Sequence, residues 1–123
     1  MRKAAVLFLL LTLIACGGGG GDDSNPQTTF SITSVEKTMT SYNRPSLMIT
    51  IKNTGGDTGY NVGCDAHALD STGKIIDTAQ AFFAGLGDIQ VAQSAIDEAV
   101  FYKLSSHADY ASIDYACSWL TRR

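Results

Sequence analysis

The sequence predicts an all-β fold, a small sandwich of short strands. From Phe30 onward, brief runs alternate between apolar and polar residues, which is typical of strands that bury one face. Clusters of Gly, Asn, Asp and Ser separate these runs, as turns separate the strands of a sandwich. The chain upstream lacks this pattern. We therefore expect an apolar leader at 1–15, a tether at 16–29 and a sandwich domain at 30–123.

The leader has the composition of an export signal. Arg2 and Lys3 precede an apolar run from Ala4 to Ile14 that only Thr12 interrupts. A run this short does not cross a hydrocarbon core of ~30 Å as a helix, so it fits a signal peptide. An N-terminal membrane helix is the alternative, but the five glycines after Cys16 supply no apolar continuation.

The segment Leu13-Ile14-Ala15-Cys16 resembles the lipobox of bacterial lipoproteins. The resemblance implies that Cys16 carries lipid, that a peptidase cleaves before it, and that the chain is anchored in the cell envelope. More than one acyl chain is expected, because a single chain binds a membrane only marginally. Gly17 stands where an aspartate would retain the protein in the inner membrane, so the resemblance implies the outer membrane. A plain secretory signal with a chance cysteine is the alternative.

Without the leader, the chain is acidic. Seven Lys and Arg remain against twelve Asp and Glu, which gives a net charge of −5. This balance disfavours nucleic acid and anionic lipid headgroups as direct partners of the domain, because both select clusters of basic residues. The roughly 108 residues that remain suffice for one domain with one core.

Lipidation of Cys16 would leave Cys64 and Cys117 as an even pair in an oxidising setting, which favours a disulfide. Such a bridge closes a loop of about 54 residues and contributes about 4 kcal/mol on the loop-entropy estimate. Two free thiols with a reactive or metal-binding role are the alternative. The sequence has no C-x-x-C spacing to support them.

Residues 17–29 contain no apolar side chain and begin with five glycines. Such a segment buries too little to offset its ordering entropy, so we expect a flexible tether with an average reach of ~20 Å. A phosphate-binding loop is the other interpretation of the glycines, but no Gly-Lys-Ser/Thr follows them. We therefore expect neither a nucleotide nor another cofactor.

The alternating runs predict strands at 30–35, 47–52, 60–68, 74–83 and 113–119, with turns at 53–57 and 70–73. The alternation slips within the first run, which predicts an edge strand with an irregularity. Leu47, Ile49 and Ile51 share one face. Two further apolar faces hold the cysteines, and they consist of Tyr60, Val62, Cys64, Ala66 and Ala68, and of Ile113, Tyr115, Cys117 and Trp119.

Residues 90–104 fit two patterns. Apolar residues at 92, 96, 100 and 104 have helical spacing, whereas Val100, Tyr102 and Leu104 share one side of a strand through 98–104. Periodicity does not distinguish the two in so short a run. The neighbouring strands favour a strand.

Two stretches, Ile49 to Gly55 and Asp70 to Ala79, resemble the FxLYD-type domain that bacterial secreted proteins and lipoproteins carry. This resemblance covers about half of the chain and implies an immunoglobulin-like β-sandwich without a catalytic motif. The F-x-L-Y-D string stands here as Ala66-His67-Ala68-Leu69-Asp70, in which only the aspartate is kept.

Few residues are candidates for chemistry. Asp65 and His67 lie two apart on one strand face, a spacing that binds a metal weakly, and a solvated polar face is the simpler interpretation. Asp97 and Glu98 alternate on a strand, so they do not form an acid–base pair. The residue types of a hydrolytic triad occur together, but adjacent positions rarely converge and no Gly-x-Ser-x-Gly elbow is present. These residues are Ser105, Ser106, His107 and Asp109.

Phe82 and Phe83 point to opposite faces of a strand, so one ring is expected at the surface as part of a contact area. With no catalytic or metal residues expected, we predict a non-enzymatic interaction or structural module. It would be held at the membrane by lipid on Cys16 and would bind another envelope protein or cell-wall material. The alternatives are an inhibitor that presents Gly85-Leu86-Gly87-Asp88 to a protease or lysozyme, and a weak metal-binding or enzymatic domain.

Overall fold

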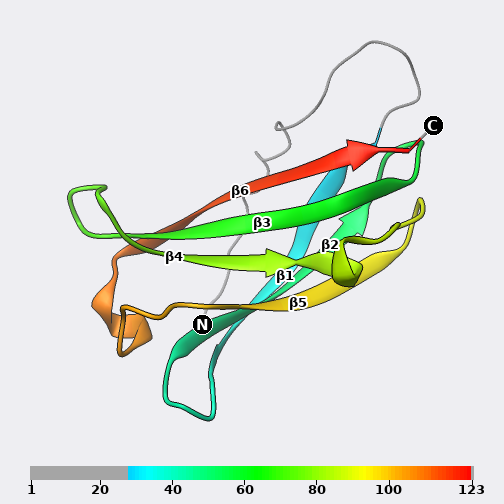
Figure 1. Cartoon of the computed structure of the whole chain (residues 1–123). Helices are drawn as coiled ribbons and strands as arrows, with labels where there is room; N and C mark the ends of the chain where they lie inside the picture. Colours follow the sequence, from blue (N-terminus) through cyan, green and yellow to red (C-terminus); the bar gives the residue numbers. More distant parts are fainter. Residues whose placement is uncertain (1–27, 123) are drawn as a thin grey trace.

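The structure is a computed structural model that describes residues 28–122, and these residues form a β-sandwich. Two three-stranded antiparallel sheets face each other (Figure 1). The all-β prediction is confirmed. No helix within residues 28–122 is long and apolar enough to cross a membrane. The leader, Cys16 and the tether up to residue 27 lie outside the described residues.

Each sheet has one central strand. The first sheet has the order β1-β2-β5, from β1 (Phe30–Met39), β2 (Pro45–Asn53) and β5 (Ser94–Val100). The second has the order β4-β3-β6, from β3 (Gly59–Leu69), β4 (Ile75–Phe82) and β6 (Ser112–Thr121). Two 3₁₀ turns join strands, η2 (Phe83–Leu86) and η3 (His107–Asp109). The four outer strands all lie at sheet edges.

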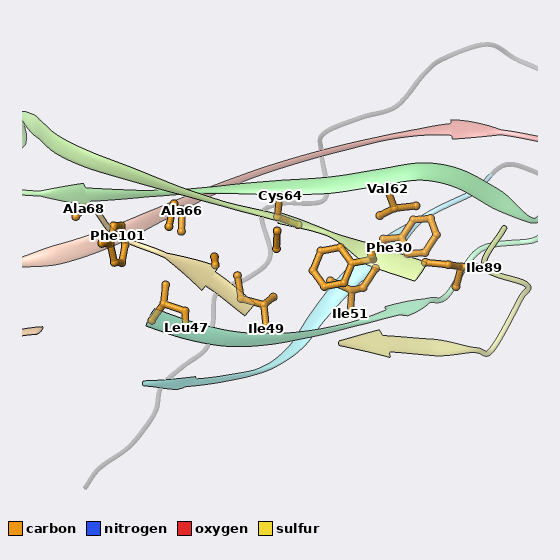
Figure 2. Close-up of a cluster of buried hydrophobic side chains, with 14 of the residues drawn as sticks. Phe30, Leu47, Ile49, Ile51, Val62, Cys64, Ala66, Ala68, Ile89 and Phe101 are labelled. Atoms are coloured by element: carbon orange, nitrogen blue, oxygen red, sulfur yellow. The ribbon is translucent and has the colours of Figure 1, made fainter. Parts of the chain in front are cut away.

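The core lies between the inner faces of the two sheets. Leu47, Ile49 and Ile51 of β2 are completely buried or nearly so, as their alternation predicts. Alanines on the facing strands let the sheets approach, and Phe30, Phe83 and Phe101 fill the remaining volume. Figure 2 shows Phe101 beside Ala66 and Ala68, and Phe30 at the far end of the core near Val62 and Ile89. Every residue of this core lies between residues 30 and 119.

The edge strand β1 has the irregularity that the slipped alternation predicts. Its register with β2 shifts between Ile32 and Ser34. The strand continues to Met39, beyond the predicted end at residue 35, because Val35 to Met39 keep pairing with β2 as far as Pro45. The prediction of an irregular edge strand is confirmed, and only its length was underestimated.

The β3–β4 hairpin turns where the sequence predicts. Asp70 Oδ1 accepts hydrogen bonds from Thr72 Oγ1 at 2.6 Å and from the backbone N–H groups of Thr72 and Lys74 at 2.9 and 3.0 Å. The bond from the Thr72 hydroxyl, followed by those from the backbone, lowers the pKa of Asp70. Gly73 occupies the left-handed region with φ of 88°, which a glycine adopts without strain.

A bulge in β3 corrects the prediction that Tyr60 shares a face with Val62. The register between β3 and β6 shifts between Tyr60 and Gly63, and Asn61 has φ of 53°. Because a bulge reverses the alternation, Tyr60 stands opposite Leu120 on the outer face, whereas Val62 is buried.

The 90–104 region contains a strand, but the predicted range of 98–104 was wrong. β5 ends at Val100, and the Phe101 N–H then donates to Pro45 O at 2.9 Å. Pairing with β2 sets the inner face, because it puts Ala99 opposite Leu47. Phe101 is therefore buried and Tyr102 exposed, which reverses the predicted grouping of Tyr102 with the apolar face.

Candidate functional site

Cys64 and Cys117 form the predicted disulfide. They stand opposite each other on β3 and β6, with their Cα atoms 3.9 Å apart. The bridge lies within one sheet, unlike the bridge of antibody domains, which joins two sheets. Neither cysteine is a free thiol, and the bridge ties the edge strand β6 to the central strand.

Asp65 and His67 form cross-strand hydrogen bonds with β4. His67 Nδ1 lies 3.0 Å from Thr78 Oγ1, and Gln80 Nε2 donates to Asp65 Oδ1 at 3.2 Å. Within residues 28–122, no group of three or more His, Cys, Asp or Glu side chains is placed to hold a metal ion. The two side chains stabilise the outer face of the sheet through these pairs.

Ser106 and Asp109, on either side of His107, cap a turn. Asp109 Oδ2 accepts from the N–H groups of Ser105 and Ser106 at 2.9 and 3.1 Å, and Ser106 Oγ accepts from the Ala108 N–H at 3.0 Å. Ser106 and Asp109 thereby form a capping box at the start of η3. The Ser106 and Asp109 side chains are directed at the backbone, so they do not assemble a triad with the histidine.

His107 attaches η3 to the edge of the other sheet. Its Nε2 lies 2.8 Å from Thr38 O on β1, and its Nδ1 lies 2.6 Å from the Tyr110 hydroxyl. A carbonyl only accepts, so Nε2 donates, and in the neutral ring Nδ1 then accepts from Tyr110. Sequence reasoning missed this contact because 69 positions separate His107 from Thr38.

Asp97 and Glu98 point to opposite faces of β5, as predicted. Asp97 stands opposite Ile49 on the inner side, where its Oδ2 accepts from the Phe82 N–H at 2.8 Å. Glu98 Oε2 accepts from Ser46 Oγ at 2.7 Å on the outer side. Each carboxylate has its own partner, and Asp97 connects β5 to the end of β4 in the facing sheet.

The strongest candidate for a binding site is the η2 surface, which we define as Phe82, Ala84, Gly85 and Leu86. Phe82 is 50% exposed and Leu86 42% exposed, whereas Phe83 between them is completely buried. The prediction of one exposed and one buried ring is confirmed. The Phe82 ring lies against Gly63 on the outer face, where a Cβ on that glycine would stand 3.3 Å from the ring.

The η2 surface has a strained backbone. Ala84, Gly85 and Leu86 have φ angles of 54°, 60° and 68°, in the left-handed region. Each non-glycine residue there costs on the order of 1–3 kcal/mol, and such strain persists only where the surroundings impose it. The buried Phe83 and a hydrogen bond from the Gly87 N–H to Ala84 O at 2.9 Å hold the turn in place. The sequence has no signal for positive φ at an alanine and a leucine.

Contacts from other segments fix the chain that follows η2. Arg122 Nη2 lies 2.8 Å from Asp88 Oδ1, and the Arg122 guanidinium stacks 3.9 Å from the centre of the Tyr60 ring. The hydrogen bond to Asp88 raises the pKa of Arg122. Ile89 and Gly59 exchange two backbone hydrogen bonds. These contacts hold the chain after η2, and the bond from the Phe82 N–H to Asp97 holds the chain before it.

Comparison with known proteins adds no assignment. No protein-family model matches the chain, and no curated protein or solved structure is significantly similar to it. The resemblances to bacterial lipoproteins and to FxLYD-type domains stay predictions.

Proposed function

We propose that this chain is a lipid-anchored binding module of the bacterial cell envelope, and that its sandwich engages another envelope protein through the η2 surface. One observation carries the proposal. Phe82 and Leu86 are exposed on a strained turn whose central side chain, Phe83, is buried in the core. Strained backbone and exposed apolar side chains are both typical of contact sites.

A rigid turn favours binding. A partner that covers Phe82 and Leu86 gains the burial of their exposed area, about 25 cal/mol per Å² of apolar surface. It does not have to order the loop at the same time, because the backbone of η2 is already fixed. The net negative charge of the chain directs the proposal toward a protein partner and away from nucleic acid.

Two features support two further parts of this proposal, the resemblance to FxLYD-type domains and the lipid anchor on Cys16. The strand orders β1-β2-β5 and β4-β3-β6 correspond to strands A-B-E and C′-C-F of an immunoglobulin sandwich, which supports the FxLYD-type resemblance. The segment Leu13 to Cys16 supports lipidation, and Gly17 supports the outer membrane as the location.

The anchor is tested by replacing Cys16 with Ser. We expect the full chain to incorporate a labelled fatty acid and to sediment with the membranes, and the C16S variant to do neither. A variant with Gly17→Ser is the control and keeps both properties. Label retained in the C16S variant would contradict the proposed anchor.

The binding surface is tested by crosslinking and pull-down from the native envelope with tagged protein that keeps Cys16. Phe82→Ser and Leu86→Ser remove the exposed apolar side chains, and Tyr102→Ser is the matched control because Tyr102 is more exposed but lies outside η2. We expect a specific envelope protein to be recovered with the wild type and Y102S, and lost with F82S and L86S. Equal recovery in all four samples would reject the η2 surface.

A second candidate function is inhibition of a protease or lysozyme. It is favoured by the fixed geometry of residues 85–88, in which the strained Leu86 lies close to the ion-paired Asp88. Titration of the domain, residues 24–123, against lysozymes and proteases separates the two functions. Inhibition that Leu86→Ser abolishes would favour an inhibitor. If the wild-type domain shows no inhibition at micromolar concentration, this function is rejected.

A further inference from the structure

We infer that β6 is a pairing edge through which two copies of the chain associate. The copies pair antiparallel around Ser118, so that Asp114 of each copy stands opposite Arg122 of the other. This surface is separate from η2, and the inference does not depend on the proposed function.

The free side of β6 is long. β6 has ten residues and pairs with β3 along one side, and no strand within residues 28–122 pairs with its other side. Figure 1 shows it as the uppermost strand of its sheet, with β3 below it. An unpaired edge of this length presents a row of N–H and C=O groups to another strand. In immunoglobulin sandwiches a further strand pairs at this position.

The other three edges carry features that discourage pairing. β6 carries no inward charge, and the extra residue at its register shift with β3 lies in β3 and not in β6. β1 has a register shift and places Lys37 opposite the inward-facing Leu47. β4 and β5 each place an aspartate on the inner face, Asp77 and Asp97. Shifts, inward charges and prolines are the usual protection of an edge. The inner face of β6 is uncharged, and it consists of Ile113, Tyr115, Cys117, Trp119 and Thr121.

The hydrogen-bonding groups on the free side belong to the odd-numbered residues. Cys64 and Cys117 form a close pair, and close antiparallel pairs are those that do not exchange backbone hydrogen bonds. The N–H and C=O of Cys117 therefore point away from β3, as do those of Tyr115 and Trp119. The Arg122 N–H, an even position, donates to Thr58 O on the β3 side. When two copies pair through β6 about a two-fold axis, odd-numbered residues of one copy stand opposite odd-numbered residues of the other. The free N–H groups of each copy then meet the free C=O groups of the other.

Charge complementarity selects the register. With Ser118 at the centre, Asp114 stands opposite Arg122 of the second copy, and Ala116 stands opposite Leu120. Moving the centre back by one residue puts Asp114 opposite Leu120, and moving it back by two puts Asp114 opposite Ser118. Only the Ser118 register among these pairs the charges, and symmetry forms that pair twice.

Arg122 has a partner within its own copy, which this contact replaces. Its Nε and Nη2 both bond to Asp88 Oδ1, at 3.2 and 2.8 Å, and its guanidinium rests on the Tyr60 ring. Tyr60 and Asp88 both lie on the β3 side of Arg122, so the guanidinium exchanges Asp88 for Asp114 of the second copy when the copies pair.

The test is sedimentation velocity over a range of concentrations with the chain from residue 17 onward, which retains the whole core. D114R and R122D each place like charges opposite one another, and the double variant D114R/R122D restores opposite charges. We expect the wild type to dimerise, each single variant to dissociate roughly tenfold more readily, and the double variant to recover most of the affinity. Monomer throughout, up to about 200 µM, would overturn the inference, and so would a double variant as weak as the single variants.

Hydrogen exchange gives a readout that needs no variant. The amides of Tyr115, Cys117 and Trp119 should exchange more slowly in concentrated wild-type protein than in dilute protein, because pairing covers them. The amides of Ala116 and Ser118 serve as internal controls, since they already face β3. Exchange at the odd positions that does not depend on concentration would overturn the inference, and would leave the η2 proposal unaffected.

Discussion

The buried side chain of Asn53 joins two loops at one end of the sandwich. Its Nδ2 donates to Asp57 O at 2.9 Å and to Ile89 O at 3.0 Å, and its Oδ1 accepts from the Gly55 N–H at 3.0 Å. The residue is completely buried, so water does not replace these partners when the side chain is removed. Asn53 therefore determines how the chain after η2 is placed against β2.

Asn53→Ala is expected to lower the free energy of unfolding by about 3 kcal/mol, because it leaves buried backbone groups without partners. Urea unfolding followed by circular dichroism measures the change. The neighbouring Thr54→Ala is the control, because Thr54 is exposed and its hydroxyl makes one long bond to Thr29 O at 3.3 Å. A loss of stability no larger than that of T54A would show that the Asn53 network is unimportant.

Two tyrosines make the fold sensitive to alkali. Burial raises the pKa of Tyr110 from 10.0 to about 12, and burial together with the nearby Tyr110 raises the pKa of Tyr115 further. The folded state therefore holds these protons more tightly than the unfolded state does. The stabilisation is fully present below pH 10.0 and is lost as pH rises from there through about 12.

We expect the free energy of unfolding to fall across this alkaline range, and to fall less steeply in Tyr110→Phe. Urea titrations at successive pH values measure the slope. Tyr42→Phe is the matched control, since Tyr42 is 85% exposed. If Y110F and Y42F give the same slope as the wild type, Tyr110 is not responsible for the alkaline loss.

At the scale of elements, the contact between β5 and β4 depends on Asp97. Its carboxylate accepts the Phe82 N–H at the last residue of β4, next to η2. Asp97→Ala is expected to lower the free energy of unfolding by about 1 kcal/mol and to speed amide exchange at Phe82. Glu98→Ala, which removes a carboxylate from the other face, should leave Phe82 exchange unchanged. An equal effect of both variants on Phe82 would contradict this role of Asp97.

The elements that the sequence predicts well are those in which alternation decides the outcome. β2 buries Leu47, Ile49 and Ile51 as predicted, because nothing interrupts its period of two. The bulge at Asn61 and the positive φ of Leu86 depend on contacts with β6 and with the core. Such contacts leave no local pattern in the sequence.

The candidate site was predicted only in part, for the same reason. Alternation at Phe82 and Phe83 predicts one exposed ring, and the structure confirms it. The register of β5 was misplaced because residues 90–104 fit both a helix and a strand, and pairing with β2 decided between them. The contact of His107 with Thr38 depends on the packing of η3 against the opposite sheet, which periodicity does not encode.

In the whole molecule, specific contacts join the two sheets along both sides of the sandwich. Asp97 connects β5 to β4 on one side. On the other side, Phe30 of β1 packs on Trp119 of β6 with ring centres 5.2 Å apart, and His107 binds Thr38. Because each contact joins residues distant in sequence, the sandwich should unfold in one cooperative step. The disulfide therefore changes the free energy of this single unfolding transition.

The bridge between Cys64 and Cys117 closes a loop that includes β4, β5 and most of β3 and β6. Its main effect is on the unfolded chain, whose freedom it restricts, so Cys64→Ala with Cys117→Ala should lower the free energy of unfolding by about 4 kcal/mol. The register of β3 with β6 involves many other pairs, so the variant should fold with the same sheet. Reversible urea unfolding measures the change, and wild-type protein unfolded with a reductant should match the double variant. A loss below about 1 kcal/mol would mean that the unfolded chain is already constrained without the bridge.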